Sequence, residues 1–193
     1  MPLNNLNLKQ SLKGSPIKLP FPLPHLIRIV FIEISLTSLY ILFVEALNCN
    51  AMFDLLNKYP NNGSFKFKST DSLNDVCNAP TNKSGVYIVI AFIGGEQELI
   101  YIGRSGKKDK KKGVIVHRKA GLGGIKDRIV NGHQFGKIAR KKSWPLEMKK
   151  NAIDHLLVLW HDTENDDPVV VEHQLLIEYE IEFGRLPVWN KVK

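Results

Sequence analysis

Glu172 is the residue whose position points most directly to chemistry. At helical spacing it shares a face with Leu175, Leu176, Tyr179 and Phe183, so one carboxylate heads an otherwise apolar stripe. A carboxylate drawn toward a core needs a cation or hydrogen-bond donors, because burying it bare is unfavourable. The pattern fits a metal ligand, a salt bridge or the exposed edge of a stripe, and periodicity alone leaves all three open.

Positive charge is concentrated in one block beside an acidic C-terminal part. The chain has 193 residues and a formal net charge of +8. Residues 104–150 hold 16 basic and 3 acidic residues, whereas residues 151–193 hold 3 basic and 9 acidic ones. Cations hold phosphates and carboxylates hold divalent metals, so this arrangement fits a metal-using enzyme of nucleic acid. A solvated basic face is the plainer alternative.

The chain from Gly85 onward alternates strands and helices. Two apolar runs, 85–93 and 98–104, are joined through Gly94-Gly95, which is typical of a β-hairpin. The later elements expected are a helix over 125–131, a strand over 154–162 and a helix from Pro168 to Phe183, capped by Asp166 or Asp167 and ended by Gly184. This order predicts an α+β domain, a small three-stranded antiparallel sheet flanked by helices.

The other segments give weaker signals. A short helix is expected between Met52 and Pro60, and loops over 61–84 and 105–119. Residues 137–150 form a second basic segment, in which we assign no helix or strand. Trp144 and Trp160 are interpreted as core residues. The two cysteines, Cys49 and Cys77, have no zinc or disulfide spacing, which favours a reducing, cytoplasmic location.

Residues 1–51 differ from the rest. Their apolar run at 29–44 contains Glu33 and is short for a membrane-spanning helix, which needs about 20 residues. Three interpretations stay open: a dispensable extension before a working start at Met52, a signal or an anchor over 26–47, and a structured part of the domain. The expected organisation is therefore an atypical extension (1–51), a helix and loop (52–82) and a main domain (83–193).

Two tripeptides connect the tyrosines of the predicted hairpin. Gly85-Val86-Tyr87 and Tyr101-Ile102-Gly103 resemble the signature of the GIY-YIG nuclease family. Four further residues of that signature follow in the family's order: Arg128 in GGIKDRIVNGH, His133, Glu172, and Asn190 in LPVWN. The resemblance covers about residues 83–191. The long basic insert after the second tripeptide resembles the restriction-endonuclease-like branch.

The resemblance implies hydrolysis of DNA with one divalent metal. Glu172 would be the ligand of Mg²⁺ (or Mn²⁺), Tyr87 and Tyr101 would border the scissile phosphate, and Arg128 would bind it. Tyr87 would be the base or its relay, assisted by His133 or a lysine of the insert. Magnesium suits a single carboxylate, because it keeps several waters and accepts phosphate oxygens as ligands.

Several assignments stay open within this hypothesis. Arg128 lies 27 residues beyond Tyr101, so that Arg104 and Arg118 are rivals for the catalytic arginine. His117 is the alternative to His133. Asn190 has a structural interpretation as well, in which its side chain caps the chain end by hydrogen bonds.

The expected partner is double-stranded DNA. The cations expected to contact its backbone are Arg104, Lys107, Lys108, Lys110, Lys111, Lys112, Arg118, Lys137, Arg140, Lys141 and Lys142. A homodimer is an open option, and restriction, repair and mobile-element roles all fit. The alternatives are a catalytically inactive DNA- or RNA-binding module on the same scaffold, and a membrane-associated protein anchored by residues 26–47.

Overall fold

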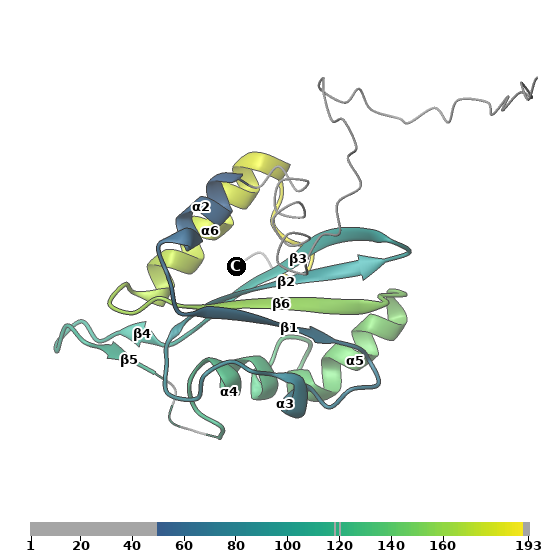
Figure 1. The fold of residues 1–193 in the computed structure, drawn as a ribbon, viewed down its shortest axis with the longest axis horizontal. Helices are drawn as coiled ribbons and strands as arrows, with labels where there is room; N and C mark the ends of the chain where they lie inside the picture. The colour runs from purple at the N-terminus through teal and green to yellow at the C-terminus, as the bar shows by residue number, and fades with distance from the viewer. Residues whose placement is uncertain (1–49, 118, 120, 191–193) are drawn as a thin grey trace, which may run out of the picture. The chain divides into compact units, whose positions relative to one another are not determined.

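The computed structural model describes residues 50–117, 119 and 121–190. Its elements are α2 (Asn50–Asn57), β1 (Asn62–Phe67), α3 (Leu73–Val76), β2 (Gly85–Ile93), β3 (Glu96–Ser105), β4 (Lys107–Lys108), β5 (Ile115–Val116), α4 (Gly124–Asn131), α5 (Arg140–Lys150), β6 (His155–Asp162) and α6 (Pro168–Phe183) (Figure 1). The expectations for residues 1–49 and for Arg118 lie outside this part of the chain. Within it, no helix is long and apolar enough to cross a membrane.

The main sheet has four strands in the order β1-β6-β2-β3, and every neighbouring pair is antiparallel. The α+β class is as predicted, but the expected three strands are one too few. β1 supplies the fourth, so the prediction of a loop over 61–84 was wrong there. Phe65 and Phe67 are buried and alternate with exposed Ser64 and Lys66, which is the two-residue period of a strand with one face in the core.

Helices cover both faces of this sheet: α2 and α6 lie on one face, and α3, α4 and α5 lie on the other (Figure 1). Successive side chains of β2 therefore enter two different cores. Val86 and Ile88 pack with the residues of α6, whereas Tyr87 and Val89 pack with those of α4 and α5. Because both faces of β2 are buried, its sequence is a continuous apolar run rather than an alternating one.

The hairpin turn and the last helix follow local signals that the sequence carries. Gly94 and Gly95 both have positive φ, 57° and 89°, as a two-residue hairpin turn requires. At the start of α6 the side chain of Asp167 accepts a hydrogen bond from the backbone N–H of Val169. Gly184 ends the helix with a left-handed φ of 67°. These predictions are confirmed.

Two basic segments are more ordered than expected. Residues 140–150 form the helix α5, with Arg140, Trp144 and Met148 buried at helical spacing. Four lysines and Pro145 in this helix conceal that stripe in the sequence. The expected loop over 105–119 contains the β4–β5 hairpin, in which Lys107 pairs with Val116.

A bulge in β3 determines which way the site residues face. Val89 is opposite Tyr101 and Ile90 is opposite Leu99, so Ile100 is an extra residue on β3. Ile100 and Tyr101 both pack toward the α4–α5 face, whereas Ile102 belongs to the core under α6. Beyond the bulge, alternation takes Arg104 to the same side as Ile102.

Candidate functional site

A cleft of about 490 Å³ lies at the β3 edge of the sheet, where α4 from one face and α6 from the other approach the same strand. Five of the six residues predicted to be catalytic line it: Tyr101, Arg128, His133, Glu172 and Asn190. A second hollow of about 320 Å³ shares Arg104 and Arg128 with the cleft and extends toward His117 and the β4–β5 hairpin. The fold therefore brings together residues that are up to 89 positions apart in the chain.

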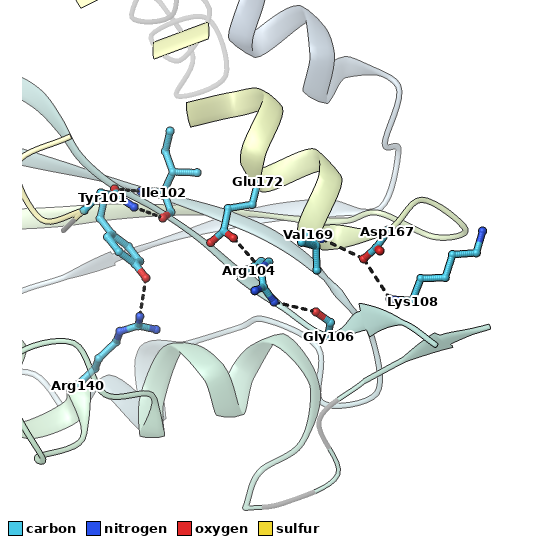
Figure 2. Close-up of polar contacts among 10 residues, drawn as sticks. Tyr101, Ile102, Arg104, Gly106, Lys108, Arg140, Asp167, Val169 and Glu172 are labelled. Atoms are coloured by element: carbon cyan, nitrogen blue, oxygen red, sulfur yellow. Dashed lines mark hydrogen bonds and ion pairs between the residues drawn. The ribbon is translucent and has the colours of Figure 1, made fainter. Parts of the chain in front are cut away.

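Glu172 is paired with a cation. The Nε atom of Arg104 lies 2.6 Å from Oε2 of Glu172, and the two side chains are 32% and 18% exposed. Figure 2 shows Glu172 reaching from α6 to Arg104 on β3. The salt bridge that periodicity left open is thus present, and Arg104 fills the electrostatic need of the half-buried carboxylate.

The cleft could hold a divalent metal through a single carboxylate. No cluster of three or more His, Cys, Asp or Glu side chains that could hold a metal ion occurs within the described residues. Magnesium does not need such a cluster, because one carboxylate, waters and substrate phosphate oxygens can complete its shell. Glu172 can be that carboxylate, provided that Arg104 shares or leaves the oxygen that it now contacts.

The two tripeptide tyrosines converge on one guanidinium. Tyr87 is fully buried, and its hydroxyl accepts a hydrogen bond from Nη1 of Arg140. The hydroxyl of Tyr101 accepts one from Nη2 of the same residue, at 2.8 Å. The two rings lie 5.9 Å apart, and Figure 2 shows Arg140 approaching Tyr101 from the side opposite Glu172. Tyr87, the sixth predicted catalytic residue, does not line the cleft.

Burial raises the pKa of Tyr101, and the neighbouring Tyr87 raises it further, while the charge of Arg140 acts in the opposite direction. The phenol is therefore protonated at neutral pH. Its oxygen already accepts a hydrogen bond from Arg140, so its own proton can go to the neighbouring Tyr87 hydroxyl or to an oxygen in the cleft. Tyr101 can donate a hydrogen bond to an oxygen in the cleft but cannot take a proton from water.

Arg140 corrects one prediction. We expected it among the exposed cations that contact a DNA backbone, but it is 0% exposed. Its other hydrogen bonds go to the carbonyl oxygen of Arg128, at 2.7 Å, and to Oε1 of Gln134, at 3.1 Å. Eight of the other predicted cations are exposed: Lys107, Lys108, Lys110, Lys111, Lys112, Lys137, Lys141 and Lys142. Arg104 is partly buried.

Gln134 was not foreseen as a site residue. It lines the cleft, and its Oε1 accepts hydrogen bonds from Arg140 and from Nε1 of Trp144, the latter at 2.9 Å. Its Nε2 donates to the carbonyl oxygen of Trp189, at 3.2 Å. Gln134 thus joins α5 to the C-terminal segment. Only its place beside His133 hinted at this role, since no periodic pattern includes it.

Asn190 holds the C-terminal segment against the edge strand. Its Oδ1 accepts from the backbone N–H of Ile102 at 2.9 Å, and its Nδ2 donates to the carbonyl oxygen of Ile102 at 2.8 Å. The backbone N–H of Trp189 bonds the carbonyl oxygen of Ile100 nearby, at 2.8 Å. These bonds match the structural interpretation of Asn190, although its side chain also borders the cleft.

The histidine and arginine alternatives occupy different places. His133 is exposed at the cleft, whereas His117 lines the second hollow. Arg128 lines both and extends from α4, and Arg104 is engaged with Glu172. Comparison of the chain with protein-family models, with curated proteins and with solved structures found no match.

Proposed function

We propose that this protein is a metal-dependent endonuclease of the GIY-YIG type that hydrolyses phosphodiester bonds of DNA, with Mg²⁺ or Mn²⁺ as its cofactor. One observation carries the proposal. Five of the six residues selected by the resemblance line one cleft, although they come from β3, α4, α6 and the segments that follow α4 and α6. A set of residues chosen by chance would have no reason to share a cleft.

The roles follow from the chemistry of each side chain. A divalent ion held by Glu172 would offset the charge of the phosphate and lower the pKa of bound water. Arg128 offers a planar fork of donors that matches phosphate oxygens. Tyr101 can donate a hydrogen bond from its hydroxyl to a phosphate oxygen. His133, exposed at the rim, can accept a proton through solvent.

The basic surface supports double-stranded DNA as the substrate. Lysines of the β4–β5 hairpin are exposed next to the second hollow, which continues from the cleft through Arg104 and Arg128. A phosphate backbone crossing both hollows would meet these cations on its way to the cleft. Such contacts position a duplex without reading its sequence.

A second function has an observation in its favour. The Arg104–Glu172 ion pair occupies a carboxylate oxygen that a metal could use. A DNA- or RNA-binding module without turnover would tolerate this contact permanently. An active enzyme requires that Arg104 share or release that oxygen, and a released guanidinium would be free to bind the phosphate.

Cleavage of supercoiled plasmid by the full-length chain separates these functions. With Mg²⁺ we expect nicking or linear product that EDTA abolishes, and we expect Glu172→Gln to reduce the rate by on the order of 100-fold or more. Glu182→Gln is the matched control, because Glu182 is exposed on the same helix and does not line the cleft. DNA binding, measured by fluorescence anisotropy, should survive in both variants.

Either failure has a defined meaning. If Glu172→Gln cuts as fast as the unaltered protein, Glu172 is not the metal ligand and the proposed mechanism is wrong. If the folded protein binds DNA but cuts no DNA with either metal, the binding module becomes the better account.

A further inference from the structure

Arg140 is a buried cation whose partners in the described part of the chain are all neutral. Its guanidinium is fully shielded from solvent and donates to two phenols, one amide oxygen and one backbone carbonyl. No carboxylate among the described residues forms an ion pair with it. Burying a cation without an anion is unfavourable, and an apolar side chain of similar volume would fill the same space without the loss of hydration energy. The charge itself therefore needs an explanation.

The surroundings of Arg140 are built to admit it. Its guanidinium carbon lies 5.0 Å from the ring centroid of Tyr101, 5.5 Å from that of Tyr87 and 5.6 Å from that of Trp144. Cations are attracted to the faces of aromatic rings, so that these rings partly replace an anion. A Cβ atom at Gly132 would lie 2.3 Å from the carbonyl oxygen of Arg128 and 2.8 Å from Nη1 of Arg140, so a larger residue there would collide with the backbone as well as with the guanidinium.

Arg140 is also connected to two sides of the cleft. It bonds the hydroxyl of Tyr101, which lines the cleft, and the carbonyl oxygen of Arg128, whose side chain lines it as well. Guanidinium groups donate hydrogen bonds and accept none. Both tyrosine oxygens must therefore be acceptors toward Arg140. The Tyr101 proton is left with two directions, toward the Tyr87 hydroxyl or toward an oxygen in the cleft.

We propose that Arg140 is a positioning residue of the cleft, whose guanidinium fixes the orientation of the Tyr87 and Tyr101 hydroxyls and so directs the Tyr101 proton toward the substrate phosphate. The inference rests on the proposed nuclease function. It adds to the six family positions a residue that touches neither metal nor phosphate and acts through the tyrosines. Since the charge of Arg140 opposes the rise in the pKa of Tyr101, its removal should make that phenol still harder to ionise.

The test compares Arg140→Gln and Arg140→Lys with Lys149→Gln in the full-length protein. Lys149 is exposed on the same helix, so its variant removes one positive charge without touching the tyrosines. We expect Arg140→Gln to lower kcat for plasmid cleavage by about 10- to 100-fold while KM for DNA changes by less than about 3-fold. Arg140→Lys keeps the charge but not the fork, and should recover part of kcat. Lys149→Gln should leave kcat unchanged.

A second measurement separates the positioning role from a purely structural one. If Arg140 acts through Tyr101, Arg140→Gln should lower kcat much less in a Tyr101→Phe background than in the unaltered protein. A purely structural role would lower the melting temperature yet leave kcat of the folded protein as it was, and that result overturns the proposal, as does an equal loss of kcat in both backgrounds. If Arg140→Gln does not fold, Arg140→Lys decides: full kcat overturns the proposal as well.

The two proposals fail in different ways. If the unaltered protein never cleaves DNA, the nuclease function is refuted and the positioning role in catalysis goes with it. If cleavage is normal and insensitive to Arg140, only the positioning role is refuted.

Discussion

At the residue scale, steric contact explains why the two tripeptides begin and end with glycine. A Cβ atom at Gly85 would lie 1.9 Å from the carbonyl oxygen of His161 on β6. One at Gly103 would lie 2.6 Å from the hydroxyl oxygen of Tyr87 and 2.6 Å from Cε1 of Tyr101. The first obstacle is backbone within a sheet and the second is a pair of side chains that can shift.

This difference predicts an order of effects. Gly103→Ala should lower the free energy of unfolding by about 1–3 kcal/mol, because the tyrosine rings must move away from their bonds to Arg140. Gly85→Ala should cost more and is expected to prevent folding or to separate β2 from β6. Urea unfolding of both variants, followed by circular dichroism, measures the order. A Gly85→Ala protein more stable than Gly103→Ala would show that the approach of β6 to Gly85 does not limit the side chain there.

The sequence indicated that Glu172 needs a compensating cation but not which residue provides it. An apolar stripe headed by a carboxylate requires a compensating cation wherever the helix packs. Arg104 lies 68 positions away and meets Glu172 only because the bulge and the alternation of β3 turn its side chain toward α6. The burial of Arg140 was equally beyond reach, because it depends on α5, a helix that the composition of residues 137–150 concealed.

At the scale of elements, the β4–β5 hairpin presents lysines from an ordered turn. The backbone N–H of Lys108 bonds Oδ1 of Asp167 at 3.0 Å, which ties the hairpin to the start of α6 (Figure 2). At the tip, Oδ1 of Asp109 accepts from the backbone N–H groups of Lys111 and Lys112. The exposed lysines of the turn therefore have a fixed base beside the second hollow.

Neutralising this turn should weaken DNA binding in a salt-dependent manner. We expect the triple variant Lys110→Gln, Lys111→Gln, Lys112→Gln to reduce the slope of log Kd against log salt by about 0.9 for each phosphate that these lysines neutralise. The matched control, Lys66→Gln, Lys68→Gln, Lys149→Gln, removes the same charge from exposed positions outside the hairpin and both hollows. Fluorescence anisotropy over a salt series measures both. Equal slopes in the two variants would mean that only total charge matters.

Elements whose ends are marked by capping or turn residues were predicted well. Elements that form only because a neighbouring strand pairs with them were not. α6 has an N-cap, a proline at its first turn and a C-terminal glycine, all readable within 18 residues. β1 has only two apolar residues in a polar stretch, and among the described strands it pairs with β6 alone. Its existence depends on an open edge of β6, which no property of residues 62–67 announces.

At the scale of the described part of the molecule, the cleft depends on a sheet that is covered on both faces. Glu172 and Arg128 come from α6 and α4, helices on opposite faces, and both line the cleft at β3, where the sheet ends. The C-terminal segment bonded to Ile100 and Ile102 closes the side of that strand. Any change that loosens the packing of the sheet is therefore expected to reach the cleft.

His161 makes the stability of this sheet depend on pH. It is 7% exposed on β6, and its Nδ1 has no hydrogen-bond partner among the described residues. Burial lowers the pKa of His161 to about 4, whereas an unfolded histidine has a pKa of about 6.5. Between these values the unfolded chain binds a proton that the folded chain does not. The contribution of neutral His161 to the free energy of unfolding is therefore fully present above about pH 6.5. It is lost as the pH falls toward 4, which lowers the free energy of unfolding by at most about 3 kcal/mol.

Urea unfolding at pH 7 and at pH 4.5 measures the pH-dependent contribution of His161 to stability. We expect His161→Gln to be less sensitive to the change of pH than the unaltered protein, even if it is less stable at pH 7. His155→Gln is the control on the same strand. Burial also lowers the pKa of His155, but this side chain is only partly buried, so we expect it to add less to the pH dependence of stability. Paired carboxylates such as Asp166, whose pKa is lowered by Lys58 and Tyr59 from an ordinary value of 3.8, cease to contribute at still lower pH. An acid sensitivity that persists unchanged in His161→Gln would assign the effect to another group.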